Sequence, residues 1–505
     1  MAAEKCAKIV QRLSNTSGEE LMITLQDLSA LLNSSSFGTR EIAPHIPARS
    51  LFGCFSTTNE EQISLCKGIL NKLLSVEKAD AIITQYHDFV IEGLNHPQFE
   101  VREFCLGELE RCSATVNGLL AILDNVDILV YTTRALSNES LACVKLASNT
   151  LINTAKHESG LEILFEHQIQ SEIEELLTKK DVIRFRVYEL FVAIQRLSEK
   201  AFKLCRKSGV LEKLAKELDG DDILLRLNSI ELLTQLADSG TNGLMFVEES
   251  GIANKLNNLL ITAEVDPLIS LMLPSIIRFF GYLAQSRPAE VIQQYPAFLE
   301  NVISFLTAAD PSLKLIAIET VGAVSHSEAG LQVVFDDKSR IHEIMKVLCT
   351  NITSSQADVK ARSLETLALI FHSTQVPSED LSALTRLLFI AMTSNPLQEL
   401  MEISKQPFQD VHYAVLKVFR SLAKYRWAQE NMTTCPGFLE YLLDRKTETD
   451  KTGKELKYEF IAELVHSPFS KEVFDKPIHL RLREYEREGP FYVQAEAAVA
   501  FEGAD

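Results

Sequence analysis

The sequence is poor in the residues that build tight loops, strands and catalytic motifs. Its 505 residues include 20 glycines, 15 prolines and one tryptophan, and stretches of alternating apolar and polar residues are rare. Several glycines, such as Gly209 and Gly251, stand at expected helix ends, which leaves few for a phosphate-binding loop. The motifs Gly-x-x-x-x-Gly-Lys, Gly-x-Gly-x-x-Gly, Gly-x-Ser-x-Gly and His-Glu-x-x-His are all missing. These absences disfavour nucleotide-dependent and zinc-hydrolase chemistry.

The sequence also lacks a pattern typical of a metal site. Its nine cysteines include no Cys-x-x-Cys pair, and its eleven histidines have no Cys or carboxylate partner at ligand spacing. Cysteines such as Cys105 and Cys205 lie in helical patterns, so we expect them to be buried in a reducing compartment. We predict no metal, no cofactor and a cytoplasmic location, with the nucleus left open as a second compartment.

Neither a membrane nor a nucleic acid is an expected partner. The start of the chain has no apolar signal segment, and the most apolar stretch, residues 268–284, contains a proline and an arginine. We expect that stretch to be a buried helix with a break. The formal net charge is −19, which opposes binding to a phosphate backbone, and no basic cluster is interleaved with aromatic residues.

Apolar residues recur at helical spacing, and the helices themselves repeat. Blocks beginning at residues 168, 209, 251, 296 and 340 each open with a short amphipathic helix that ends in an apolar turn. The spacing of about 41 to 45 residues is typical of HEAT or armadillo units. The sequence therefore predicts an all-α protein, an α-solenoid of HEAT/armadillo-like helical repeats.

A charged motif recurs in four of these repeats. After each first helix comes an aspartate, then a cation, then a glutamate inside the second helix, five positions after the cation. The four copies are Asp181, Arg184 and Glu189; Asp222, Arg226 and Glu231; Asp310, Lys314 and Glu319; and Asp358, Lys360 and Glu365. Weaker copies begin at His96, Ser137 and Pro407.

Each part of the motif has an expected role. An aspartate in the first turn accepts from free backbone amides and suits the positive end of the helix dipole. The cation is expected to pair with an aspartate of its own or the neighbouring repeat, which would form a ladder along the stack. The alternative is that these are accidental charges on exposed helix faces, but four aligned copies favour a repeat.

We expect one elongated helical-repeat array over residues 1–505, with ends that differ from its middle. Its expected parts are N-terminal atypical repeats (1–95), central HEAT-like repeats (96–380), C-terminal repeats (381–479) and a charged helix with an acidic tail (480–505). A break is expected at residues 34–47 and a charged loop at residues 447–457. The single tryptophan, Trp427, is expected to pack in the core rather than to stack on a ligand.

Whole segments of the chain resemble the 26S proteasome non-ATPase regulatory subunit 5 family, which is a family of HEAT-repeat assembly chaperones. The match is specific in the C-terminal half and loose over roughly the first hundred residues. The segments that carry it are DVIRFRVYEL (181–190), QPFQDVHYAVLKVF (406–419), RWAQENM (426–432), PGFLEYLLDR (436–445), KYEFIAEL (457–464) and LRLREYEREGPFYV (480–493).

The resemblance implies a protein that is not an enzyme and that helps to assemble the base of the proteasome regulatory particle. It implies binding to the C-terminal domain of an ATPase subunit, regulatory subunit 7, in a module with regulatory subunit 4 and non-ATPase subunit 2. It also implies release before or as the base joins the core particle. The family has no short motif that assigns partner-binding residues, so these stay unknown; Glu189 and Glu231 are only guesses.

Two alternatives come from other functional classes. A generic armadillo/HEAT scaffold or transport adaptor would need the same solenoid, but an importin-like groove carries a ladder of tryptophans, and this chain has one tryptophan. An enzyme with an unfamiliar active site is disfavoured by the missing motifs. The segment KDVIRFRVYELF also poses a question, because Arg184 and Arg186 both lie among apolar residues. Only Arg184 occupies the repeated cation position.

Overall fold

The computed structural model describes the chain apart from residues 1, 14–15, 34–41, 264–265, 355 and 494–505. Most of the expected break at 34–47 and most of the expected acidic tail lie outside the described residues. The remainder divides into two compact units, residues 1–220 and residues 221–505. The expected boundaries at residues 95, 380 and 479 stay predictions.

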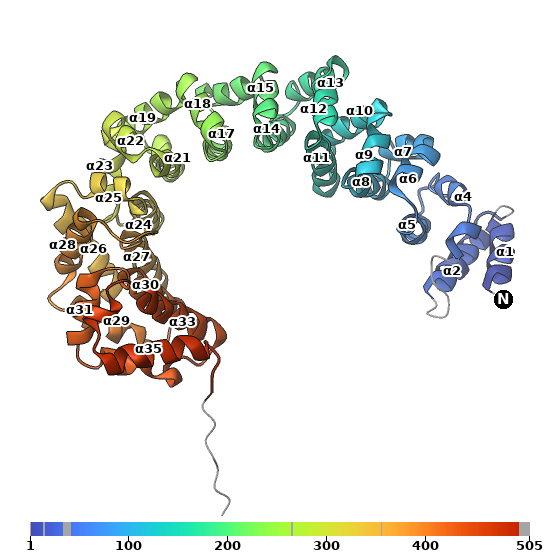
Figure 1. The fold of residues 1–505 in the computed structure, drawn as a ribbon. Helices are drawn as coiled ribbons and strands as arrows, with labels where there is room; N and C mark the ends of the chain where they lie inside the picture. The colour runs from blue at the N-terminus through green and yellow to red at the C-terminus, as the bar shows by residue number, and fades with distance from the viewer. Residues whose placement is uncertain (1, 14–15, 34–41, 264–265, 355, 494–505) are drawn as a thin grey trace, which may run out of the picture. The chain divides into compact units, whose positions relative to one another are not determined.

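All regular secondary structure in the described residues is helical, which confirms the predicted all-α class (Figure 1). The helices of the first unit are α1 (Ala2–Leu13), α2 (Glu19–Asn33), η1 (Ala43–His45), α4 (Ala48–Gly53), α5 (Glu60–Leu74), α6 (Ala79–Gln85), α7 (His87–Leu94), α8 (Phe99–Ser113), α9 (Val116–Leu123), α10 (Val126–Arg134), η2 (Ala135–Ser137), α11 (Leu141–Ala155), α12 (Glu158–Leu164), α13 (His167–Leu177), α14 (Asp181–Gln195), α15 (Glu199–Lys207), α16 (Val210–Lys216) and η3 (Glu217–Asp219).

The second unit continues the same order of short and long helices. They are α17 (Ile223–Ala237), α18 (Thr241–Glu249), α19 (Ile252–Thr262), α20 (Pro267–Ser270), α21 (Leu273–Ser286), α22 (Pro288–Gln294), α23 (Pro296–Phe305), α24 (Pro311–Ser325), α25 (Glu328–Val334), α26 (Lys338–Ser354), α27 (Ala357–Ile370), α28 (Glu379–Met392), α29 (Pro396–Ser404), α30 (Gln409–Leu422), α31 (Arg426–Thr434), α32 (Phe438–Leu443), η4 (Arg445–Thr447), α33 (Lys451–His466), α34 (Ser470–Val473) and α35 (Lys476–Glu488).

Most repeats consist of three helices, two shorter ones followed by one of 14 to 16 residues that we call the long helix. Helices α12, α13 and α14 form one such repeat. The long helix is the helix predicted to carry the charged motif. The predicted block starts fall at the second short helix of a repeat, as at α13, which precedes α14. The first short helix of each repeat, such as α12 or α15, was not predicted from the sequence.

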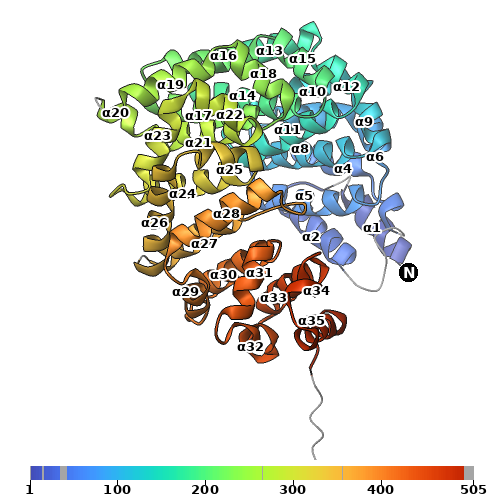
Figure 2. The ribbon, with the colours of Figure 1, turned by 60° about the vertical axis from the view of Figure 1, so that its left-hand side comes forward.

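Long helices pack against one another in chain order. In the first unit α5, α8, α11 and α14 are successive neighbours, and in the second unit α17, α21, α24, α27, α30 and α33 are. Figures 1 and 2 show that the long helices of each unit lie side by side in a row, and that the shorter helices all lie on one side of this row. In each unit the core lies between the row of long helices and the shorter helices. In the second unit, apolar residues such as Leu233, Ile277 and Val321 are fully buried there. The α-solenoid architecture is therefore confirmed.

In four repeats a glycine at the third position of the first short helix lets the chain turn sharply after the long helix. A Cβ atom on Gly160 would lie 2.3 Å from the carbonyl oxygen of Thr154 in α11, and one on Gly330 would lie 1.8 Å from that of Val324 in α24. Real atoms cannot approach this closely, so only glycine fits these turns without a shift of the backbone. Gly118 and Gly243 occupy the same position in α9 and α18 and make equally close approaches.

Two expectations about individual segments have different outcomes. The apolar stretch at 268–284 is a helix with a break, as expected, because α20 ends at Ser270 and α21 begins at Leu273. Only α21 is buried, since Leu268 and Leu271 are each 62% exposed, so the expected burial is wrong for the first part. The loop expected at 447–457 is wrong, since α33 begins within it at Lys451. Asp450 caps that helix by accepting a hydrogen bond from the amide of Gly453 at 2.9 Å. This cap favours the start of a helix even though the segment is rich in charged residues. No helix in the described ranges is long and apolar enough to cross a membrane.

Candidate protein-binding surface

The four predicted cations occupy one structural position. Arg184, Arg226, Lys314 and Lys360 are each the fourth residue of a long helix, and the predicted glutamates are each the ninth. Every copy of the motif therefore lies at the same height along its own long helix.

The four aspartates lie at the start of these long helices and divide into two pairs. Asp222 and Asp310 are N-caps, and each accepts a 2.8 Å hydrogen bond from a backbone amide two residues later. Asp181 and Asp358 are the first residue of α14 and the second residue of α27, so they lie within the first helical turn. All four carboxylates suit the positive end of a helix dipole.

Arg184 contacts two carboxylates rather than one. It pairs with Asp181 of its own helix at 2.7 Å and with Glu217 at 2.6 Å. Glu217 also accepts a 2.9 Å hydrogen bond from the hydroxyl of Tyr188, and its side chain is 16% exposed. This half-buried contact joins α14 to the segment that follows α16 in the next repeat.

The other predicted cations behave differently from Arg184. Lys360 donates to the Oε1 atom of Gln406 at 3.3 Å. Arg226 and Lys314 form no ion pair with any residue that the structure describes, and the Nε atom of Arg226 is buried without a hydrogen-bond partner. The expected contact with an aspartate is therefore present at Arg184 but not at these three positions.

A histidine occupies the same helix position in the next repeat. His412 is the fourth residue of α30, and its Nε2 atom lies 2.6 Å from a carboxylate oxygen of Glu448. Glu217, Gln406 and Glu448 all stand shortly before the start of the next long helix in the chain. The fourth residue of a long helix thus contacts the segment that leads into the following long helix at three points of the array.

The glutamates form a second set of contacts, between adjacent long helices. In the second unit the ion pairs are Glu231–Arg278 at 3.8 Å, Glu319–Arg362 at 3.5 Å, Glu365–Lys417 at 2.9 Å and Glu459–Arg420 at 2.5 Å. Their side chains are between one third and one half exposed, so each pair contributes less than about 1 kcal/mol to stability. Glu189 in the first unit is exposed and has no ion pair in the described part of the chain.

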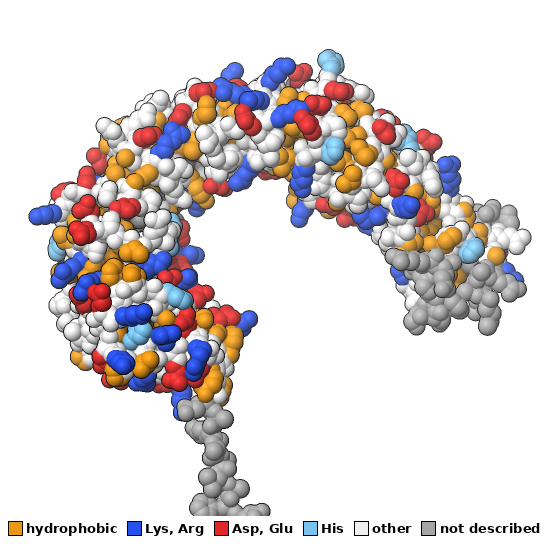
Figure 3. Space-filling view, in the orientation of Figure 1, with side chains coloured by type: hydrophobic (Ala, Val, Ile, Leu, Met, Phe, Trp, Pro, Cys, Tyr) orange, Lys and Arg blue, Asp and Glu red, His pale blue; other side chains and the backbone are white. Residues whose placement is uncertain are grey.

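These pairs leave the face of the long helices charged but nearly balanced. Figure 3 shows acidic and basic side chains interspersed over the visible face of the second unit, with small apolar areas between them. A mixed face of this kind suits a folded protein partner better than a nucleic acid.

Arg186 has a different contact from Arg184. Its Nη1 atom donates to the carbonyl oxygens of Leu136 at 2.9 Å and Asn138 at 2.8 Å. It therefore anchors the segment before α11, one repeat back along the chain, whereas Arg184 contacts the segment after α16. The two arginines of α14 tie this helix to both neighbouring repeats of the first unit.

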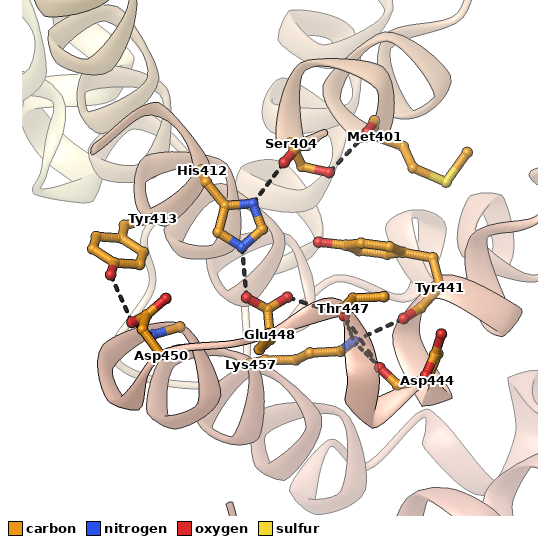
Figure 4. A network of polar contacts seen from close by, with 11 residues as sticks. Met401, Ser404, His412, Tyr413, Tyr441, Asp444, Thr447, Glu448, Asp450 and Lys457 are labelled. Carbon is orange, nitrogen blue, oxygen red and sulfur yellow. Dashed lines mark hydrogen bonds and ion pairs between the residues drawn. The ribbon is translucent and has the colours of Figure 1, made fainter. Parts of the chain in front are cut away.

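A buried polar network surrounds His412 and Glu448 (Figure 4). The Nδ1 atom of His412 lies 2.7 Å from the carbonyl oxygen of Ser404, and Glu448 also accepts from the hydroxyl of Thr447 at 3.1 Å. Burial alone would lower the pKa of His412, but the hydrogen bond and charge of Glu448 raise it overall. The same contact lowers the pKa of Glu448 against the effect of burial.

Lys457 in α33 completes this network and is fully buried. Its Nζ atom donates to the carbonyl oxygens of Tyr441 at 2.8 Å and Asp444 at 2.7 Å, and to the hydroxyl of Thr447 at 2.5 Å. It also lies 4.8 Å from the centre of the Tyr441 ring. Burial lowers the pKa of Lys457 to about 8. The environment of this lysine is therefore a structural one, because its side chain is fully buried and its amine makes three hydrogen bonds.

Trp427 is a core residue, as expected. Its ring centre lies 5.0 Å from that of Phe389 and 5.7 Å from that of Tyr425, and it is 6% exposed. Among the described residues no group of three or more His, Cys, Asp or Glu side chains is placed to hold a metal ion.

Comparison with known proteins gives the family of this chain. The family model described as "Proteasome non-ATPase 26S subunit" matches residues 2–505. The chain is 32% identical over 483 residues to the 26S proteasome non-ATPase regulatory subunit 5 of Bos taurus, covering 95% of this chain and 96% of the relative. It is 31% identical over 468 residues to that of Homo sapiens, covering 92% and 93%.

Solved structures show the fold at lower identity. Kap95 in a Kap95:Nup1 complex has a TM-score of 0.58 at 12% identity, covering 97% of this chain and 63% of that one. Importin beta has a TM-score of 0.51 at 11% identity, covering 95% and 64%. At this identity the likeness concerns the helical solenoid alone, whereas the full-length sequence match concerns ancestry. The chain therefore belongs to the proteasome non-ATPase 26S subunit family.

Proposed function

We propose that this protein is a non-enzymatic chaperone for assembly of the base of the 26S proteasome regulatory particle. The observation that carries the proposal is the full-length similarity to proteins named 26S proteasome non-ATPase regulatory subunit 5, at 31 to 33% identity. The proposed partner is the C-terminal domain of regulatory subunit 7, in a module with regulatory subunit 4 and non-ATPase subunit 2. The proposed location is the cytoplasm, and the nucleus as well.

The row of long helices supports a mechanism for this function. It presents half-exposed side chains of both signs over many repeats, from Glu231 in α17 to Glu459 in α33. Such a surface can hold a folded domain through many weak contacts that exclude water around a few strong ones. An ATPase domain held in this way would be kept from docking on the core particle until the chaperone leaves.

The test is a pull-down of the purified full-length protein with the separate C-terminal domains of the six proteasomal ATPases. Selective capture of the subunit 7 domain is the expected result, with the other five domains as internal controls. Circular dichroism confirms that the protein is folded and helical in the same preparation. No capture of any domain by the folded protein would overturn the proposal, and equal capture of all six would favour a generic adaptor.

A further inference from the structure

Two adjoining hollows run along the junction of α27 and α30 in the second unit. The first has a volume of about 760 Å³ and lies at the N-terminal ends of these helices, where Ala357, Ala361 and Phe408 line it. The second has a volume of about 460 Å³ and lies towards the C-terminal ends, beside His372 and Lys424. Glu365 and Lys417 line both hollows, so together they form one groove, which we call the α27–α30 groove.

The α27–α30 groove has opposite charges at its two ends. Asp358 and Asp410 lie at the N-terminal end, and neither forms an ion pair within the described ranges. Arg362 lines the same hollow, but it pairs with Glu319 at 3.5 Å and with Glu365 at 3.3 Å. Lys417, Arg420 and Lys424 line the other end. Glu365 pairs with Lys417, and Glu463 lies 3.8 Å from Lys424; both carboxylates line the same hollow. Arg420 pairs with Glu459 at 2.5 Å and more loosely with Glu463 at 3.7 Å. The groove is therefore negative where α27 and α30 begin and basic on the α30 side where they end.

An apolar anchor point lies at the acidic end. Phe408 precedes α30, and it is 49% exposed although it is a large aromatic residue. The small side chains of Ala357 and Ala361 face the same hollow. An exposed aromatic residue beside small apolar residues is typical of a point where a partner side chain inserts.

We propose that the α27–α30 groove binds an α-helix of the partner protein, antiparallel to α27 and α30. This inference rests on the proposed function and adds the binding element and its direction. Both helices have 14 residues, which corresponds to a groove of about 21 Å and a partner helix of about four turns.

The charge distribution determines the direction. Helices favour acidic residues in their first turn and basic residues in their last turn, because of the helix dipole. An antiparallel partner helix would place an acidic first turn beside Lys417, Arg420 and Lys424. Its basic last turn would lie beside Asp358 and Asp410. A parallel helix with the same preferences would place like charges together at both ends of the groove.

Binding of the captured ATPase C-terminal domain to variants of the full-length protein tests the groove. Phe408→Ala and Asp410→Lys are each expected to raise the Kd about tenfold in isothermal calorimetry, since each removes a contact at the acidic end. The matched controls are Phe99→Ala, which removes an equally exposed aromatic residue from α8, and Asp380→Lys, at the second position of α28 as Asp410 is of α30. Both controls should leave the Kd unchanged.

Zero-length carbodiimide cross-linking of the wild-type complex tests the direction. It joins amines to carboxylates, so Lys417 or Lys424 should be linked to acidic residues in the first turn of one partner helix. Asp358 or Asp410 should be linked to lysines in its last turn. Links with the reverse order would overturn the antiparallel arrangement.

The outcomes separate this inference from the function on which it rests. If the wild-type protein captures no ATPase domain, the proposed function fails and the inference fails with it. If the wild type binds and the two groove variants bind equally well, only the groove inference is overturned. Weakened binding in the groove variants, with unchanged binding in both controls, supports it.

Discussion

The buried amine of Lys457 is expected to contribute measurably to the stability of the C-terminal repeats. In Lys457→Met the methionine fills nearly the same space, but the Nζ atom and its three hydrogen bonds are lost. Each acceptor left without a donor in the interior costs about 1 to 3 kcal/mol. The variant is also relieved of burying a charge, which offsets part of this loss. We therefore expect the free energy of unfolding to fall by about 2 to 4 kcal/mol.

Hydrogen–deuterium exchange is the suitable assay, because a repeat array need not unfold in a single step. Amides of α33 and of the segment before it should exchange faster in Lys457→Met, while those of the first unit should not change. The control is Lys451→Met in the same helix, whose side chain is 76% exposed and whose loss should change stability by less than about 0.5 kcal/mol. Equal protection of α33 in both variants and the wild type would refute a structural role for the amine.

The same residue predicts a dependence on pH. The pKa of Lys457 is about 8 in the folded protein, below its ordinary value, so the unfolded chain binds more protons above pH 8. The contribution of Lys457 to the free energy of unfolding therefore rises with pH between about 8 and 10.5. This contribution is lost as the pH falls through the folded pKa. The difference between the wild type and Lys457→Met should grow by about 2 kcal/mol from pH 7.5 to 9.5. A constant difference over this range would contradict the lowered pKa.

Two further predictions concern the contacts of the fourth helix position. Because the pKa of His412 is raised in the folded protein, this histidine stabilises the fold below about pH 6.5, and the stabilisation is lost as the pH rises through the folded pKa. Because the pKa of Glu448 is lowered, this glutamate stabilises the fold above about pH 4.5, and the stabilisation is lost as the pH falls through the folded pKa. A double-mutant cycle of His412→Gln and Glu448→Gln should thus show its largest coupling, about 1 to 3 kcal/mol, near pH 5.5, and an equal coupling at pH 8.5 would contradict this. Arg184→Ala should lower the free energy of local unfolding, from hydrogen exchange of α14, by about 1 to 3 kcal/mol. The matched Arg226→Ala should lower that of α17 by less than about 1 kcal/mol, because only Arg184 holds a partly buried ion pair. Equal losses would show that the ion pair contributes nothing.

The fold could be predicted because the long helices carry their signal locally. Apolar residues recur at helical spacing within the long helices, and four of them, including α14 and α17, also carry the charged motif at fixed helix positions. The first short helices, such as α12 and α15, have only 7 to 9 residues, which is about two turns and too few to show a periodicity. A usable signal for them was present in the sequence. Small residues at the third position recur at 118, 160, 201 and 243, at intervals of 42, 41 and 42 residues.

The partners of the cations could not be predicted, because the linking segments differ in length. Arg184 lies 33 residues before Glu217, Lys360 lies 46 residues before Gln406, and His412 lies 36 residues before Glu448. No constant spacing joins donor and acceptor, so periodicity finds the cation and not its partner. Lys457 was missed for a related reason, since its acceptors are mostly backbone carbonyls, which any sequence supplies.

The two sets of contacts suggest a division of tasks within each repeat. Half-buried contacts of the fourth helix position, such as Arg184 with Glu217 and His412 with Glu448, hold a long helix to the segment leading into the next one. The pairs between long helices are much more exposed and contribute little to stability. A charge that contributes little to the fold can exchange its partner at little cost when a protein binds. In the proposed α27–α30 groove, the exposed pairs would therefore take part in recognition, while the contacts of the fourth helix position preserve the spacing of the helices.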